Sequence, residues 1–187
     1  MSNNILKIKS MKQFNYYLIL FFILGSLQLN AQNIALDVPY VPTPQKVVVG
    51  MLELADVKKG EVVYDLGCGD GRIVITAAKE YGATGIGVDL NPVRIEEANT
   101  NAEEAKVKDK VTFHVDDLFN FDFSKADVLA LYLLPDVNMK LRPKIQSEMK
   151  PGSRIVSHAF DMGDWEPNKK ISVDGKTIYL WIIPDKK

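Results

Sequence analysis

Short apolar runs alternate with amphipathic stretches along most of the chain, a pattern that predicts β-strands alternating with α-helices. The runs with the length of strands are 62–66, 84–89, 111–115, 126–132 and 154–158. The stretches with apolar residues at helical spacing are 44–55, 72–80, 92–105 and 135–150. The run 126–132 is almost uninterrupted, as expected of a central parallel strand buried on both faces. Such alternation is typical of an α/β fold with a mostly parallel sheet.

Prolines and turn residues refine these boundaries. Thr43 is expected to cap the helix that Pro44 opens, and Pro143 should kink or divide the helix over 135–150. Near the C-terminus, Asp174-Gly175 separates two β-prone segments and is a strong signal for a hairpin turn. We therefore expect the parallel sheet to end in an antiparallel hairpin.

The N-terminal segment differs in kind from the rest of the chain. A lysine-containing start precedes an apolar run over 16–29, and Ala31 stands before polar residues. This pattern predicts a signal peptide over residues 1–31, cleaved after Ala31, and hence an exported or periplasmic protein. The alternatives are an uncleaved membrane anchor or a cytoplasmic protein whose apolar start is not a signal. The folded domain is expected over residues 37–185.

Composition and charge exclude several classes of site. The chain has 187 residues and a formal net charge of -1, without a long block of like charge, which argues against a nucleic-acid substrate. Its single cysteine, Cys68, permits neither an intramolecular disulfide nor a cysteine-based metal site, and no metal is predicted. We expect one domain, acting as a monomer.

The most informative segment is the loop at 65–71, between the first strand and the next helix. It carries glycine at alternate positions: Gly67, Gly69 and Gly71. This spacing differs from the dinucleotide fingerprint G-x-G-x-x-G and from a phosphate loop, which argues against a dinucleotide-dependent oxidoreductase. Two acids, Asp65 and Asp70, would repel a pyrophosphate but suit a ligand with positive charge.

The sequence Asp65-Leu66-Gly67-Cys68-Gly69-Asp70-Gly71 resembles motif I of the class I S-adenosylmethionine-dependent methyltransferases. The resemblance implies a single-domain, Rossmann-like, seven-stranded sheet in which the glycine backbone and Asp65 face the amino-acid part of the cofactor. The helix that the family places between strands five and six would be reduced here to a loop, 159–169. A non-catalytic module that binds S-adenosylmethionine or a nucleoside remains an alternative.

Two further acids complete a nucleoside site. Asp89 ends the second strand about 20 residues after motif I, the interval at which an acid reaches ribose hydroxyls. The resemblance implies that Asp117 meets the adenine amine, with Asp116 as its competitor. The alternative roles are structural: Asp65 and Asp89 could cap helices, and Asp117 could be an ordinary turn acid.

Segments outside motif I indicate a subgroup. Two segments, Pro39-Tyr40-Val41-Pro42-Thr43-Pro44 and Trp165-Glu166-Pro167, resemble the small protein-lysine N-methyltransferases of the mitochondrial ATP synthase c-subunit and adenine nucleotide translocase type, together with their bacterial relatives. The resemblance implies a protein lysine as methyl acceptor, whereas the residues themselves are equally compatible with a small molecule.

The acceptor side of the site is less explicit. The fourth strand is followed by Leu133-Leu134-Pro135 rather than by Asn-Pro-Pro-Tyr, the motif of enzymes that methylate base amines. This leaves Tyr132 as the candidate catalytic residue in the acceptor channel. Tyr40, His158 and Trp165 are the candidate substrate-binding residues. Because a sulfonium is a good leaving group and the acceptor amine can be neutral, no dedicated base is required.

Overall fold

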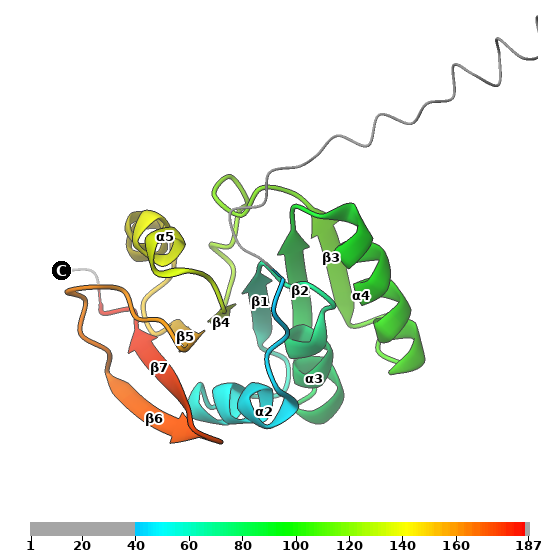
Figure 1. Cartoon of the computed structure of the whole chain (residues 1–187), viewed down its shortest axis with the longest axis horizontal. Coiled ribbons are helices and arrows are strands. Elements are labelled where there is room, and N and C mark those ends of the chain that lie inside the picture. Colours follow the sequence, from blue (N-terminus) through cyan, green and yellow to red (C-terminus); the bar gives the residue numbers. More distant parts are fainter. Residues whose placement is uncertain (1–39, 186–187) are drawn as a thin grey trace, which may run out of the picture. The chain divides into compact units, whose positions relative to one another are not determined.

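The computed structural model describes residues 40–185, which form a seven-stranded sheet flanked by helices (Figure 1). The helices are α2 (Gln45–Leu54), α3 (Arg72–Glu80), α4 (Pro92–Glu104) and α5 (Pro135–Glu148). The strands are β1 (Val62–Leu66), β2 (Thr84–Asp89), β3 (Val111–Val115), β4 (Val128–Leu131), β5 (Arg154–His158), β6 (Lys169–Val173) and β7 (Lys176–Ile182). The predicted signal segment, 1–31, lies outside the described residues. Within 40–185, no helix is both long and apolar enough to cross a membrane.

The strand order is β3-β2-β1-β4-β5-β7-β6. Strands β1 to β5 are parallel, whereas β7 runs antiparallel to β5 and to β6. This order confirms the predicted fold class, a mostly parallel Rossmann-like sheet that ends in an antiparallel hairpin. At the hairpin turn Asp174 and Gly175 both have positive φ, 52° and 74°, as a two-residue turn of type I′ requires.

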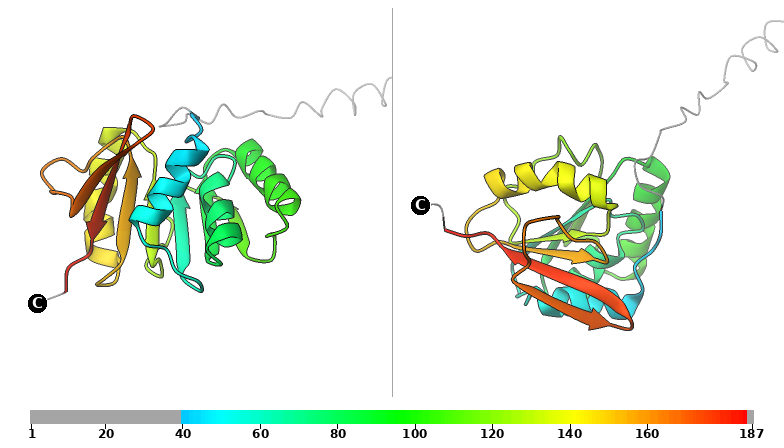
Figure 2. Two further views of the ribbon diagram at one scale, coloured as in Figure 1. Left: turned by 90° about the horizontal axis from the view of Figure 1, so that it is seen from below. Right: turned by 60° about the vertical axis from the view of Figure 1, so that its left-hand side comes forward.

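The central strand β4 is buried on both faces, as its apolar run predicts. Leu129 and Leu131 pack in the cluster that contains α5, while Val128 and Ala130 pack in the cluster that contains α2 and α3. Figure 2 shows α5 on the opposite side of the sheet from α2 and α3. The sheet is therefore packed between two layers of helices, and the loops that follow its strands extend from its carboxyl edge.

Three local features differ from expectation. Thr43 does not cap α2: the N-cap is Pro44, and the Thr43 hydroxyl is within hydrogen-bonding distance of His158. Pro143 does not divide α5, because it lies on the exposed side of the helix, where water can replace the backbone bond that proline cannot make. Strand β4 is also shorter than its apolar run, since Ala126 and Asp127 belong to the preceding turn.

Candidate functional site

A pocket opens at the carboxyl edge of the sheet, where the loops after β1, β2, β3 and β4 converge. The predicted site residues that line it are Tyr40, Asp65, Gly67, Gly69, Asp89, Asp117 and Tyr132. These residues come from four strand ends and from the segment before α2, so the fold brings together parts that are distant in sequence. Ligands of open α/β sheets bind at this edge.

The glycine loop needs its glycines for two physical reasons. Gly67, Gly69 and Gly71 have φ values of 78°, 52° and 78°, in the left-handed region that other residues seldom adopt. A Cβ on Gly69 would also lie 2.4 Å from the ring of Tyr40. Gly71 does not line the pocket; it is the N-cap of α3 and turns the chain into that helix.

Asp65 is the most unusual group in the pocket. It is 3 % exposed, and no donor among the described residues forms a hydrogen bond to its carboxyl. Burial, reinforced by the charges of Asp89 and Asp70, raises the pKa of Asp65 to about 8. Asp65 does not cap α3. An unpaired buried carboxyl at a pocket wall is suited to a cationic ligand group.

Asp89 is held by two backbone amides. Gly69 N–H donates to its Oδ2 and Asn91 N–H to its Oδ1, both at 2.9 Å. The cap of α4 is Asn91, whose Oδ1 accepts from Val93 N–H at 3.0 Å, so Asp89 is not the helix cap. Each Asp89 oxygen keeps a lone pair for a further donor, such as a ribose hydroxyl.

The loop after β3 brings two acids to the pocket. Asp117 accepts hydrogen bonds from Phe119 N–H and from the Asn120 side chain, both at 2.9 Å, so it does act as a turn acid. Asp116 is exposed and also lines the pocket. The geometry leaves both carboxylates available to an amine.

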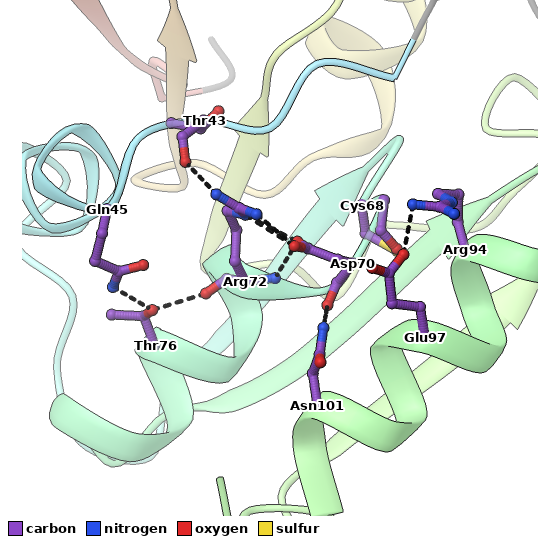
Figure 3. Close-up of polar contacts among 10 residues, drawn as sticks. Thr43, Gln45, Cys68, Asp70, Arg72, Thr76, Arg94, Glu97 and Asn101 are labelled. Carbon is purple, nitrogen blue, oxygen red and sulfur yellow. Dashed lines mark hydrogen bonds and ion pairs between the residues drawn. The ribbon is translucent and has the colours of Figure 1, made fainter. Parts of the chain in front are cut away.

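An ion pair stabilises the far side of the glycine loop (Figure 3). Arg72 donates to Asp70 through Nε at 2.9 Å and to the Thr43 carbonyl at 2.9 Å. Burial opposes ionisation of Asp70, but the hydrogen bonds and charge of Arg72 outweigh it and hold the pKa of Asp70 below its usual value. Arg72 therefore links the loop to the segment that precedes α2.

That segment, residues 40–43, covers part of the pocket; we call it the strap. The Tyr40 ring lies against Gly69 on the glycine loop, and the Arg94 guanidinium lies 4.6 Å from its centroid. At the other end of the strap, the Thr43 hydroxyl is 3.2 Å from His158 Nδ1. The strap thus contacts four parts of the fold: the glycine loop, α3 through Arg72, α4 through Arg94 and β5 through His158. No motif in the sequence identified the contribution of Arg94.

The candidate acceptor residues separate into two groups. Tyr132 lines the pocket, and its ring lies 3.9 Å from that of His158. His158 is 1 % exposed and does not line the pocket; burial, with the charge of Lys176, lowers its pKa to about 4, so it is neutral near pH 7. Trp165 is not brought to the pocket: its carbonyl accepts from Trp181 Nε1 at 2.7 Å, and the two rings pack together.

The chain is similar in sequence to known methyltransferases. Residues 65–169 match the family model described as the ANTKMT methyltransferase domain. The chain is 47% identical over 155 residues to a protein-lysine N-methyltransferase from Saccharolobus islandicus, covering 80% of this chain and 96% of that protein. It is 34% identical over 132 residues to the adenine nucleotide translocase lysine N-methyltransferase of Mus musculus, covering 71% of this chain but only 57% of that protein.

Solved structures agree in fold. The crystal structure of an RNA methyltransferase from Salinibacter ruber, in complex with S-adenosyl-L-homocysteine, superposes with a TM-score of 0.77 at 52% identity, covering 79% of this chain and 96% of that one. A methyltransferase from Geobacter sulfurreducens, also with S-adenosyl-L-homocysteine, superposes with a TM-score of 0.55 at 27% identity, covering 68% and 51%.

Proposed function

The chain belongs to the ANTKMT methyltransferase family and is an S-adenosylmethionine-dependent methyltransferase, and from this premise we propose that its methyl acceptor is a lysine side chain of a protein. The observation that carries the proposal is the 47% identity to a protein-lysine N-methyltransferase along 96% of that enzyme. The net charge of -1 and the absence of a long basic block support a protein acceptor over RNA.

RNA is the second candidate acceptor, because the Salinibacter protein, which is named an RNA methyltransferase, is 52% identical. The two acceptors differ in what they need from the surface around the pocket. RNA requires cations that pair with phosphates, whereas a lysine side chain requires a narrow apolar channel. The pocket rim carries Asp116 and Asp117, which disfavour phosphates near the mouth.

We propose that the cofactor lies across the ends of β1, β2 and β3. The unpaired carboxyl of Asp65 fits the ammonium group of the cofactor, and the backbone of Gly67 and Gly69 approaches its amino-acid part. Asp89 accepts from the ribose hydroxyls. Asp117 meets the adenine amine, and Asp116 is close enough to the pocket to share this role. These placements rest on which groups line the pocket and keep an acceptor lone pair for a ligand, since Asp65 is unpaired and the oxygens of Asp89 and Asp117 each accept one hydrogen bond.

Bound S-adenosylmethionine supplies an electrophilic methyl group on a good leaving group. The protein therefore has to hold a neutral amine in line with that methyl group and to exclude water. Tyr132 stands at the end of β4, beside the loop after β1, and is our candidate to border the acceptor channel. The strap covers the pocket from the other side and shields the reacting atoms from solvent.

Cell lysate incubated with labelled S-adenosylmethionine and the purified enzyme tests the acceptor class. We expect the label to resist nuclease, to be released by protease and to appear on lysine after hydrolysis. Label that nuclease releases would identify RNA as the acceptor. Cofactor binding without any transfer would instead indicate a binding module.

Asp89→Ala tests the cofactor placement. We expect the affinity for S-adenosylhomocysteine to fall about 10- to 100-fold, because charge-assisted hydrogen bonds contribute roughly 1.5–3 kcal/mol. Circular dichroism should show an unchanged fold. Asp109→Ala, which alters an exposed acid outside the pocket, is the matched control. Unchanged affinity in Asp89→Ala would contradict the proposal that Asp89 binds the ribose hydroxyls.

We further propose that residues 1–31 direct export or anchor the protein in a membrane. The basic start and the short apolar run at 16–29 support this proposal. Export would separate the enzyme from the cytoplasmic supply of cofactor, so the compartment bears directly on function. Fractionation of the native cells, with N-terminal sequencing of the mature protein, tests both cleavage at Ala31 and location.

A further inference from the structure

The backbone makes a strained turn where β5 ends, next to the pocket. Ala159 has a φ of 68°, and Phe160 N–H donates to the His158 carbonyl at 2.9 Å, which closes a three-residue γ-turn with positive φ at its centre. This form of the γ-turn is rare because a side chain at its centre is sterically strained. Such strain persists only where the surrounding structure enforces it, and it concentrates at functional sites.

Two buried side chains hold this turn. Ser157 Oγ donates to the Phe160 carbonyl at 2.7 Å, and Asn138 Nδ2, from α5, donates to the Asp161 carbonyl at 3.2 Å. Asn138 is fully buried, yet its Oδ1 has no partner among the described residues. The same holds for His158 Nε2, so two buried polar atoms are left without hydrogen bonds beside one turn. Each buried polar atom without a hydrogen bond lowers the stability of the folded state, and the turn that positions Phe160 is formed despite this loss.

The turn sets Phe160 beside Tyr132. The two rings are within 17° of parallel, with centroids 6.3 Å apart, and both side chains are partly exposed although the preceding strands, β4 and β5, are buried. On the same ring of Tyr132 lies His158, at 3.9 Å. Tyr132 lines the pocket, whereas Phe160 does not line it and extends the aromatic surface from Tyr132 towards the end of β5. A partly exposed aromatic face beside a pocket offers an apolar surface against which a ligand chain can pack.

The strand order indicates which ligand this is. The proposed cofactor contacts occupy the ends of β3, β2 and β1, and the next strands across the sheet are β4, which precedes Tyr132, and β5, which precedes Phe160. A methyl acceptor has to approach from beyond the reacting end of the cofactor. The pair therefore lies on the side from which the acceptor enters.

Resting on the proposed lysine methylation, we propose that Tyr132 and Phe160 form the binding surface for the alkyl chain and amino group of the acceptor lysine. We call this pair the acceptor wall. Aromatic faces bury methylene groups and attract ammonium groups. In the reaction, the lysine nitrogen lone pair forms a bond to the methyl carbon as the sulfur–carbon bond breaks. Sulfur keeps the bonding pair as a neutral thioether, and the resulting ammonium loses its proton to water. Phe160 is a specificity residue in this scheme, and Ser157 and Asn138 are positioning residues.

A pair of cofactor analogues tests the wall without knowledge of the natural acceptor. The first is S-adenosylhomocysteine, which ends at the sulfur. The second carries nitrogen in place of sulfur, with an alkylamine chain of lysine length attached to it. We expect the wild type to bind the analogue with the alkylamine chain more tightly than S-adenosylhomocysteine. Phe160→Ala should lower the affinity for that analogue roughly tenfold and leave the affinity for S-adenosylhomocysteine unchanged.

Further variants separate contact from folding. Phe160→Tyr should retain the advantage of the chain, and Tyr81→Ala, a partly buried aromatic at the end of α3, should leave both affinities unchanged. Equal loss of both ligands in Phe160→Ala would mean a general structural effect and would overturn the proposal. The proposal would also be overturned if the alkylamine chain did not increase the affinity of the wild type for the analogue.

The proposed function fails independently of the wall. If lysate labelling places methyl groups on RNA, lysine methylation is wrong, whatever the analogues show. If lysine is labelled but Phe160→Ala leaves both the analogue affinities and the KM for a lysine-containing peptide unchanged, only the wall is wrong. We expect a higher peptide KM in Phe160→Ala, with the KM for S-adenosylmethionine unchanged.

Discussion

At the scale of single residues, Asp65 in the pocket wall and His158 behind Tyr132 are buried titratable groups that are both neutral near pH 7. Asp65 keeps its proton because burial and the charges of Asp89 and Asp70 raise its pKa to about 8. His158 lacks a proton because burial, with the charge of Lys176, lowers its pKa to about 4. One stands at the proposed donor side of the pocket and the other behind Tyr132.

The Asp65 carboxyl should release its proton when the cofactor binds. The ammonium group of the ligand favours the ionised carboxylate and lowers the pKa of Asp65, so binding at pH 7 liberates close to one proton. Calorimetric titration with S-adenosylhomocysteine in buffers of different ionisation enthalpy measures this proton directly. Asp65→Asn should abolish the release and weaken binding about tenfold or more. Identical heats in all buffers for the wild type would contradict the assignment.

The residues that line the pocket were predictable only where a motif or the family resemblance identified them. The glycine spacing, Asp65 and Asp89 were identified from their positions at strand ends, and Asp117 from the family resemblance. All of them except Gly71 line the pocket. Thr43 was assigned to a helix cap because that is a local rule. Its actual partner, His158, is 115 residues away, which no local rule reveals. The contact between Phe160 and Tyr132 has the same long-range character.

At the scale of elements, the predicted strands and helices agree with the structure, and the predicted loop in place of a helix after β5 is confirmed by the absence of a helix between 159 and 168. The hydrophobic pattern was sufficient for β1, β4 and β5 because these strands are almost entirely buried. The strain in the turn after β5 was invisible, because alanine gives no sign of a positive φ.

Ala159→Gly should stabilise the protein by about 1 kcal/mol, because glycine removes the steric penalty of a left-handed backbone. Part of that gain is offset by the greater freedom of glycine in the unfolded chain. Urea denaturation measures the change. Ala105→Gly, at a position with a φ of -74°, is the control and should not stabilise. A destabilised Ala159→Gly would show that the turn is not strained.

At the scale of the whole molecule, the two neutral groups predict an unusual dependence of stability on pH. Between pH 4 and 6.5 the unfolded chain has Asp65 ionised and His158 protonated, whereas the folded protein has the reverse. The two states therefore hold equal numbers of protons at these groups, and the pair contributes no slope. From pH 6.5 to 8 only the folded state retains the Asp65 proton, so stability falls as pH rises.

We expect this fall to amount to about 1 kcal/mol for the free protein between pH 6.5 and 8, as measured by urea unfolding. Asp65→Asn should remove it. The same variant should expose the contribution of His158, which is present above pH 6.5 and lost as pH decreases towards 4. A wild-type profile that rises from pH 6.5 to 8 would contradict the charge states assigned to the pocket.

The enzyme class was predictable from the sequence, whereas the acceptor was not. Cofactor recognition is concentrated in short segments with fixed spacing, and the match of residues 65–169 to the ANTKMT methyltransferase domain confirms the class. The proposed acceptor side is built from residues that meet only through folding, such as Tyr132, His158 and Phe160. Its composition is that of an ordinary core, so no pattern distinguishes it.

The strand order also has a consequence for how such enzymes can diversify. The strands that carry the proposed donor contacts, β1 to β3, form one continuous stretch of sequence, and β4 and β5, which carry the acceptor wall, form the next. A single recombination point between 118 and 127 would divide the two. Chimeras of related chains joined there should inherit cofactor affinity from one parent and acceptor choice from the other.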